Sequence, residues 1–233
     1  MTRGRTLRPF EYEPAGKPSL FARWERDEDS AMTAPIAVRS AAYRALIADV
    51  LEAHRLPGAT LLSVGAGNGF AEAVLQDRGW DVTATDCAED AVALCRAKGL
   101  AAERLDLLVD PPTRRFDAIY CDGLLGHLWQ DGAGTSAAWL ALAAHAAPAA
   151  VCLASNDLAD DDLAPTLRVR SAAGVEFYRP PAGWFARDAL ATGRWELERQ
   201  HIHHYERAGE RRRRELVLVR LLVDDRVVAE GGE

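Results

Sequence analysis

The chain has 233 residues, 48% of them hydrophobic, which fits one sizeable globular domain with a buried core. Its formal net charge of −7 does not supply the basic field that nucleic-acid surfaces usually need, so we expect no nucleic-acid partner. The first residues lack the apolar core of a secretory signal, and the longest apolar stretch, Ala137 to Ala154, contains His145 and Pro148. We therefore expect a cytoplasmic protein with no membrane partner.

Cysteines and histidines do not form a recognisable metal-binding pattern. The chain has no CxxC pair, and no histidine lies near a cysteine at zinc-finger spacing. His201, His203 and His204 share one predicted strand, but no matching carboxylate pair accompanies them, so a solvated strand face is expected. We predict free thiols and no metal site.

The middle of the chain alternates between strand and helix patterns. Residues 1–35 are expected to be irregular, and helical spacing of apolar residues predicts a helix over 38–54. Five strands and three further helices follow, an order that predicts a parallel sheet covered on both faces. The predicted strands are 60–64, 81–85, 101–105, 116–121 and 149–155, and the helices are 69–79, 88–98 and 135–146.

The last third of the chain has a different pattern. A polar, acidic loop is expected over 156–162, followed by a small hairpin formed by 166–170 and 175–179. A helix over 185–192 precedes two long strands, 195–205 and 215–223. The four arginines Arg211 to Arg214 are expected in the polar turn between these strands, as solvated charge.

A glycine-rich loop between the first strand and the next helix is the central motif. Glycines 65, 67 and 69 stand at alternate positions, where bare backbone and a helix amino terminus can approach a ligand. This GxGxG spacing departs from the GxGxxG of nicotinamide enzymes, since position 70 is Phe. Asp86 ends the second strand about 20 residues later, the distance expected for a carboxylate that binds ribose hydroxyls. Capping the helix from Ala88 is the structural alternative for Asp86.

The ordered motifs resemble those of class I S-adenosylmethionine-dependent methyltransferases of the small-molecule type. The resemblance covers roughly Leu61 to Ser155. It implies S-adenosylmethionine (SAM) as the cofactor and an α/β fold, a Rossmann-like, doubly wound, mostly parallel seven-stranded sheet with a C-terminal antiparallel hairpin. The motifs that carry the resemblance are Val64-Gly-Ala-Gly-Asn-Gly69, Asp86, Arg104-Leu-Asp106-Leu and Phe116-Asp-Ala-Ile-Tyr-Cys-Asp-Gly-Leu-Leu-Gly-His-Leu128.

The resemblance also implies a role for individual residues. Gly65, Ala66 and Gly67 would hold the methionine portion of SAM, and Asp86 the ribose. Cys87 and Leu107 would lie against the adenine and Asp106 would accept from its amino group. Cys121 and Asp122 would line the cofactor near its sulfonium. Asp106 as a turn cap and Asp122 as a solvated loop acid are the alternatives.

Methyl transfer from a sulfonium depends mainly on binding and alignment, and a general base is needed only for a protonated acceptor. His127, just after the fourth strand, is the candidate base, although it also fits a helix start. Asp110-Pro111-Pro112 precedes that strand, so it is interpreted as a rigid loop, not as the acidic Pro-Pro motif of base and amide methyltransferases.

We interpret residues 1–233 as a single methyltransferase domain. Its parts are an N-terminal lid and helix (1–57), a cofactor-binding core (58–155), an acceptor-side insertion (156–182), and a closing helix with antiparallel strands (183–233). Acceptor selection is expected in the lid and in the insertion. The aromatic residues that suggest this are Phe10, Tyr12, Phe21 and Trp24 in the lid, and Phe177 and Tyr178 in the insertion.

The favoured function is O- or N-methylation of a small molecule in biosynthetic metabolism, and the abundance of Ala and Arg is typical of a GC-rich bacterial genome. A Rossmann oxidoreductase, a non-catalytic SAM-binding protein and an RNA methyltransferase remain open. The observation that favours the RNA alternative is the run of arginines, Arg211 to Arg214. The sequence also leaves open the identity of the acceptor and the oligomeric state, for which a homodimer is one alternative.

Overall fold

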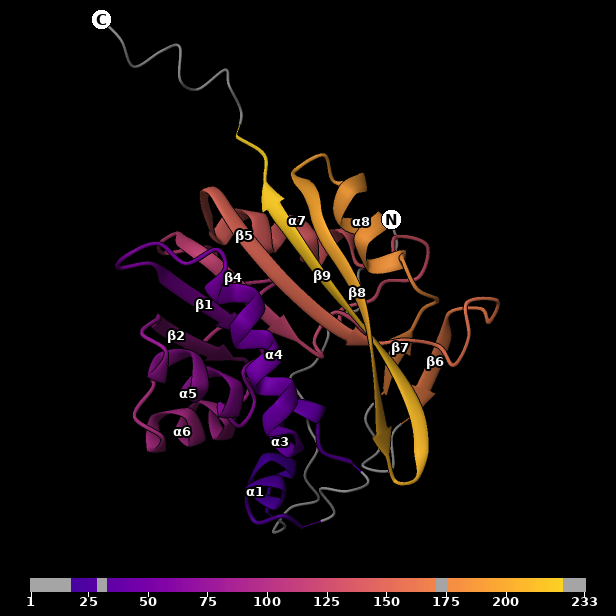
Figure 1. Cartoon of the computed structure of the whole chain (residues 1–233), viewed down its shortest axis with the longest axis horizontal. Coiled ribbons are helices and arrows are strands. Elements are labelled where there is room, and N and C mark those ends of the chain that lie inside the picture. The colour runs from indigo at the N-terminus through magenta and orange to yellow at the C-terminus, as the bar shows by residue number, and fades with distance from the viewer. Residues whose placement is uncertain (1–17, 29–32, 171–175, 224–233) are drawn as a thin grey trace, which may run out of the picture.

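A seven-stranded sheet organises the chain in the computed structural model, which describes residues 18–28, 33–170 and 176–223 (Figure 1). The strand order is β3-β2-β1-β4-β5-β9-β8; β1 to β5 pair in parallel, and β9 is antiparallel to both of its neighbours. The predicted doubly wound sheet with a closing antiparallel hairpin is confirmed. The strands are β1 (Thr60–Val64), β2 (Asp81–Asp86), β3 (Ala101–Arg104), β4 (Phe116–Asp122), β5 (Ala146–Asp157), β8 (Trp195–Arg207) and β9 (Glu210–Leu221).

Helices cover both faces of this sheet (Figure 1). Successive strand residues alternate between two apolar clusters: Ala118 of β4 packs with α4 and α5, whereas its neighbour Ile119 packs with α7 and α8. None of the helices in the described ranges has the length and apolarity needed to cross a bilayer. The helices are α1 (Leu20–Glu25), α3 (Ile36–Arg39), α4 (Ala41–Glu52), α5 (Phe70–Asp77), α6 (Glu89–Ala97), α7 (Ser136–His145) and α8 (Trp184–Ala191).

The prediction for the closing hairpin is wrong in one respect that affects the site. The turn between β8 and β9 consists only of Ala208 and Gly209, both with positive φ, as two-residue hairpins prefer. The run Arg211 to Arg214 therefore lies within β9, where alternate side chains face opposite sides of the sheet. Arg214 faces inward and is almost completely buried, so it is not solvated charge.

The amino-terminal region also differs from the prediction. Helix α1 lies inside the segment expected to be irregular, and Ser19 caps it by accepting a hydrogen bond from the Ala22 amide. The expected helix over 38–54 is broken at Ser40, whose hydroxyl caps α4 by accepting from the Tyr43 amide at 3.1 Å. The extended backbone of Ser40 separates the short α3 from α4 and bends the chain between them.

After β5 the chain forms a smaller, separate hairpin. The predicted pair of short strands is confirmed as β6 (Leu167–Arg170) and β7 (Glu176–Arg179), with antiparallel pairing. Strand β5 runs on to Asp157, two residues into the segment expected to be a loop, because β9 is long enough to continue pairing with it. Phe10 and Tyr12, expected in the lid, lie outside the described residues.

Candidate functional site

The glycine loop lies at the carboxyl end of β1 and leads directly into α5. Gly65, Gly67 and Gly69 all have positive φ. At Gly69, which precedes α5, a Cβ atom would meet Cys95 Sγ at 2.8 Å, and at Gly65 it would meet Leu124 at 3.3 Å. The Gly65 and Ala66 amides donate to the Thr85 carbonyl of the adjacent β2. The loop thus brings bare backbone close to the ends of β2 and β4.

Asp86 lies beside this loop at the end of β2, as the sequence spacing predicted. Its Oδ2 accepts from the Gly67 amide at 3.0 Å, and its Oδ1 accepts from the Ala88 amide at 2.9 Å. Ala88 is the residue that precedes α6, so this contact closes the turn before the helix and does not cap the helix itself. Burial raises the pKa of Asp86, and the amides of Ala88 and Gly67 oppose that rise. Each carboxylate oxygen has a second lone pair that a hydroxyl can use.

The residues expected around the adenine lie next to Asp86. Cys87 follows it, and burial raises the pKa of its thiol to about 11, with the nearby carboxylates of Asp86 and Asp106 adding to the rise. Asp106 Oδ1 accepts from the Leu108 amide at 3.2 Å, which is the turn-capping contact. Leu107 is buried in the apolar core. The adenine contacts of these three residues stay a prediction.

Two further predicted residues end β4. Cys121 is fully buried in the apolar core, so any contact with a ligand at the sheet edge would have to come from its backbone. Asp122 is not a solvated loop acid: its side chain is 9% exposed and forms an ion pair with Arg214. Its Oδ1 also accepts hydrogen bonds from Tyr43 Oη and Ser155 Oγ. The cofactor contacts of both residues stay predictions.

Arg214 is the centre of a buried polar network that the sequence pattern did not reveal. Its guanidinium pairs with Asp122 at the end of β4 and, at 2.6 Å, with Asp157 at the end of β5. The Nε atom donates to Tyr43 Oη at 3.1 Å and to Ser155 Oγ at 3.0 Å. Burial alone would raise the pKa of Asp157, but Arg214 and Arg207 hold it below its usual value. The network joins α4, β4, β5 and β9 at the edge where the glycine loop lies.

Glu72, in the first turn of α5, is a second buried carboxylate that sequence reasoning missed. Its Oε1 accepts from Ser63 Oγ at 2.6 Å, beneath the glycine loop. Burial raises the pKa of Glu72 to about 7, and Ser63 partly offsets the rise. A charged residue at position 72, within the apolar segment that follows the glycine loop, was the available signal.

Helix α1 packs over the glycine loop. Asn68 Nδ2 donates to the Phe21 carbonyl at 3.0 Å and to Glu25 Oε2 at 2.7 Å. Lys98, directly after α6, pairs with the same Glu25 at 2.5 Å. A Cβ at Gly67 would lie 3.5 Å from the Phe21 ring. Phe21 and Trp24, predicted in the lid, therefore belong to a helix that covers the loop.

His127 lies in the segment after β4, against the small β6–β7 hairpin. Its Nδ1 is 3.1 Å from the Glu176 carbonyl, and its ring centroid is 5.4 Å from that of Phe177. Burial lowers the pKa of His127 to about 4. Tyr178 of the same hairpin stacks on Trp129 at 5.8 Å, so the predicted aromatic residues of the insertion lie beside the segment that carries His127.

The predicted solvated face of β8 is only partly exposed. His203 is half-buried, with its ring centroid 5.3 Å from that of Tyr43. Within the described ranges, no group of three or more His, Cys, Asp or Glu side chains is arranged to hold a metal ion.

Known proteins resemble this chain in sequence or in fold. A methyltransferase-domain family model matches residues 37–211. A tabtoxin biosynthesis enzyme of Pseudomonas amygdali pv. tabaci is 34% identical over 113 residues, 48% of this chain and 45% of that enzyme, so the match spans about half of either protein. A SAM-dependent methyltransferase of Methanosarcina mazei is 11% identical with a TM-score of 0.65, over 75% of this chain and 98% of that one. A Burkholderia thailandensis 1,6-didemethyltoxoflavin-N1-methyltransferase, solved with S-adenosylhomocysteine, is 19% identical with a TM-score of 0.61, over 91% and 93%.

The sheet order, the glycine loop and the carboxylates that follow β2 and β3 define a class I SAM-dependent methyltransferase. The chain belongs to the methyltransferase-domain family, whose model covers most of it, and SAM is its cofactor. The expected class, fold and cofactor are confirmed.

The donor set at this edge fits SAM. The carboxylates of Asp86, at the end of β2, and Asp106, after β3, suit ribose hydroxyls and an exocyclic amine. The glycines at 65 and 67 present backbone without side chains to the methionine portion. Asp86 and Asp106 would hold the nucleoside, and residues 65–67 the amino-acid end. When bound, SAM supplies an electrophilic methyl group on a sulfonium.

Proposed function

We propose that this chain methylates a nitrogen or oxygen of a small-molecule acceptor in a bacterial biosynthetic pathway. The observation that carries this proposal is the internal pairing of the arginine run on β9. Arg212 lies 3.4 Å from Asp160, Arg213 lies 2.6 Å from Asp162, and Arg214 is buried between two carboxylates. Three of the four arginines in the run are thus paired with the chain's own carboxylates, which reduces the positive charge that β9 presents to RNA phosphates.

The similar proteins support the same acceptor class. One is named for the biosynthesis of tabtoxin, and the other acts on 1,6-didemethyltoxoflavin. Neither name identifies the acceptor of this chain, because the first match covers half of each protein and the second is only 19% identical. The acceptor class therefore has to be tested by measuring which molecules receive the methyl group.

We expect a methyl label to enter small molecules. The purified chain is incubated with tritiated SAM and a bacterial extract separated into low-molecular-weight, RNA and protein fractions. Tritium should appear in the low-molecular-weight fraction, and the rate should change less than about twofold between 50 and 200 mM salt. Contacts with several phosphates would instead weaken binding by about 10³-fold or more over that range. Label in the RNA fraction with such a salt dependence would overturn the proposal.

The chain's own residues must orient the acceptor, exclude water and remove a proton where the acceptor carries one. We assign proton removal to His127. The Nδ1 contact with the Glu176 carbonyl favours the neutral tautomer with its lone pair on Nε2, and the lowered pKa keeps the ring neutral at pH 7. A neutral imidazole can accept a proton, and because a pKa of about 4 makes it a weak base, it suits an acceptor whose own proton is acidic.

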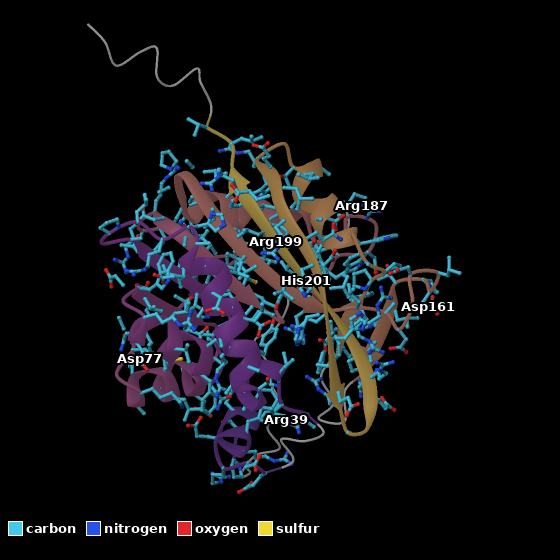
Figure 2. All side chains as sticks on the ribbon, in the orientation of Figure 1. Arg39, Asp77, Asp161, Arg187, Arg199 and His201 are labelled. Atoms are coloured by element: carbon cyan, nitrogen blue, oxygen red, sulfur yellow. The ribbon has the colours of Figure 1, made fainter. Side chains whose placement is uncertain are left out.

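His127→Ala should lower kcat by about 10²-fold at saturating acceptor, with the KM for SAM unchanged. Because the pKa of His127 is about 4, kcat of the parent enzyme should stay flat from pH 8 to pH 5 and fall only as pH approaches 4. His201→Ala, an exposed histidine on β8 (Figure 2), is the matched control. Turnover by the His127 variant equal to that of the control would end this assignment.

A further inference from the structure

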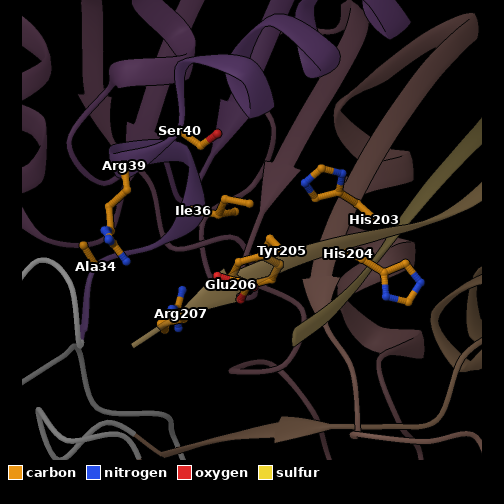
Figure 3. Close-up of a pocket in the computed structure, with 9 residues that line it drawn as sticks. All are labelled: Ala34, Ile36, Arg39, Ser40, His203, His204, Tyr205, Glu206 and Arg207. Carbon is orange, nitrogen blue, oxygen red and sulfur yellow. The ribbon is translucent and has the colours of Figure 1, made fainter. Parts of the chain in front are cut away.

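A groove separates the bend between α3 and α4 from the far end of β8 (Figure 3). Its volume is about 320 Å³, near the lower end of the range for small-ligand sites. Ile36, Arg39 and Ser40 form one side. Residues 203–207 of β8 form the other side. The sequence pattern predicted this strand only as part of the closing hairpin.

The β8 side of the groove carries three residues spaced two apart, His203, Tyr205 and Arg207. Since alternate residues of a strand share a face, all three side chains project toward α3 and α4. The rings of His203 and Tyr205 are 6.4 Å apart and nearly parallel at 13°, and the Arg207 guanidinium lies 5.6 Å from the Tyr205 ring centroid. Together they form a flat aromatic surface with a guanidinium at one end.

The two arginines of the groove lie at the same end. In Figure 3, Arg39 and Arg207 are both on the side of Ala34, whereas His203 is at the opposite end. Arg207 Nη1 lies 3.8 Å from Asp157 Oδ2, an ion pair that is longer than a hydrogen bond. Glu206 also borders the groove, but strand alternation turns its side chain to the other face of β8. The arginine end therefore offers guanidinium donors to an anionic group.

The opposite end of the groove is connected to the cofactor edge. His203 contacts the Tyr43 ring at 5.3 Å, and Tyr43 Oη donates to Asp122 Oδ1 at 3.2 Å. Asp122 ends β4, and β4 pairs with β1, the strand that leads into the glycine loop. One aromatic residue thus separates the histidine end of the groove from the edge that holds SAM.

We infer that this groove is the acceptor site and that it selects a small planar acceptor bearing a carboxylate. The inference rests on the proposed function. The ring lies on Tyr205, and the carboxylate is bound by Arg39 and Arg207, which leaves the rest of the molecule directed toward His203 and the edge of the sheet. A neutral analogue forfeits the two charge-assisted contacts and gains no others.

The test uses the full chain saturated with S-adenosylhomocysteine and two probes of the same shape. Quinoline-2-carboxylate and quinoline-2-carboxamide are titrated separately by calorimetry. The carboxylate should bind at least tenfold more tightly than the amide. Arg39→Gln and Arg207→Gln, on different elements, should each reduce that preference to about twofold. Arg199→Gln makes the same change elsewhere on β8 (Figure 2) and should leave it intact.

Equal affinity for the two probes, or a preference that survives both groove substitutions, would overturn this inference. S-adenosylhomocysteine affinity is measured in the same preparations. A chain that binds S-adenosylhomocysteine without preferring the carboxylate would contradict the groove assignment alone, whereas a chain that does not bind it would contradict the proposed function. Using arginines from two elements keeps the test valid if one variant fails to fold.

Discussion

Replacing Arg214 by methionine should lower the free energy of unfolding by about 3–5 kcal/mol, a loss that urea denaturation can measure. The substitution keeps the length of the side chain but leaves Asp122 and Asp157 without their buried guanidinium. Tyr43 and Ser155 also lose their donor. Breaking a buried ion pair from one side is costly because the remaining charge is neither solvated nor paired.

The pH dependence gives this prediction a second readout. The pKa of Asp157 is lowered in the folded state, so its contribution to stability is present above the unfolded pKa of about 3.9 and is lost as pH falls through the folded value. Without Arg214, buried carboxylates should instead have raised pKa values. The variant should therefore become more stable, relative to its own value at pH 7, as pH falls toward 5.

The control for this prediction is the neighbouring arginine. Arg213→Met removes a pair with the exposed Asp162 and should cost less than about 1 kcal/mol. Because Arg213 only lowers the pKa of Asp162 further below its usual value, stability should not change between pH 7 and pH 5. Equal losses for the two variants would show that the buried network does not stabilise the sheet edge in the way described.

Asp86→Ala should weaken S-adenosylhomocysteine binding at least 100-fold, which corresponds to about 3 kcal/mol. The carboxylate is expected to accept from two ribose hydroxyls, and a hydrogen bond to a charged group contributes about 1.5–3 kcal/mol. Its loss also leaves the Gly67 and Ala88 amides without their acceptor, so the loop itself is less well held.

Asp90→Ala, in the exposed first turn of the next helix, is the matched control and should bind as the parent chain does. Thermal unfolding of both variants separates a folding defect from a binding defect. An affinity within threefold of the parent for a folded Asp86 variant would mean that this carboxylate does not hold the nucleoside.

Local patterns were sufficient to predict the parallel core of the fold. Residues 118–121 of β4 are buried on both faces of the sheet, so they form an apolar run. The glycines of the loop take positive φ in a short turn. Asp86 is positioned by the length of one strand–helix–strand unit. Such features depend on neighbours close in sequence, which is why they can be identified without the structure.

The buried network could not be predicted in the same way. Arg214 contacts Tyr43, which lies 171 positions earlier in the chain. Four consecutive arginines suggest a solvent-exposed segment unless the partner of each is known. Because the turn consists only of Ala208 and Gly209, the arginine run lies in β9 and not in the turn. In β9, Arg214 faces the carboxyl ends of β4 and β5. His203 became part of a groove for the same reason: its environment depends on α4, which is distant in sequence.

Calorimetric titration of the parent chain with S-adenosylhomocysteine, and then with NAD under the same conditions, tests most directly whether the glycine-loop edge is a SAM site. Saturable binding of one S-adenosylhomocysteine per chain, with no heat from NAD, is the expected result. Binding of NAD, or of neither ligand, would contradict the assignment of this edge and every functional conclusion that depends on it.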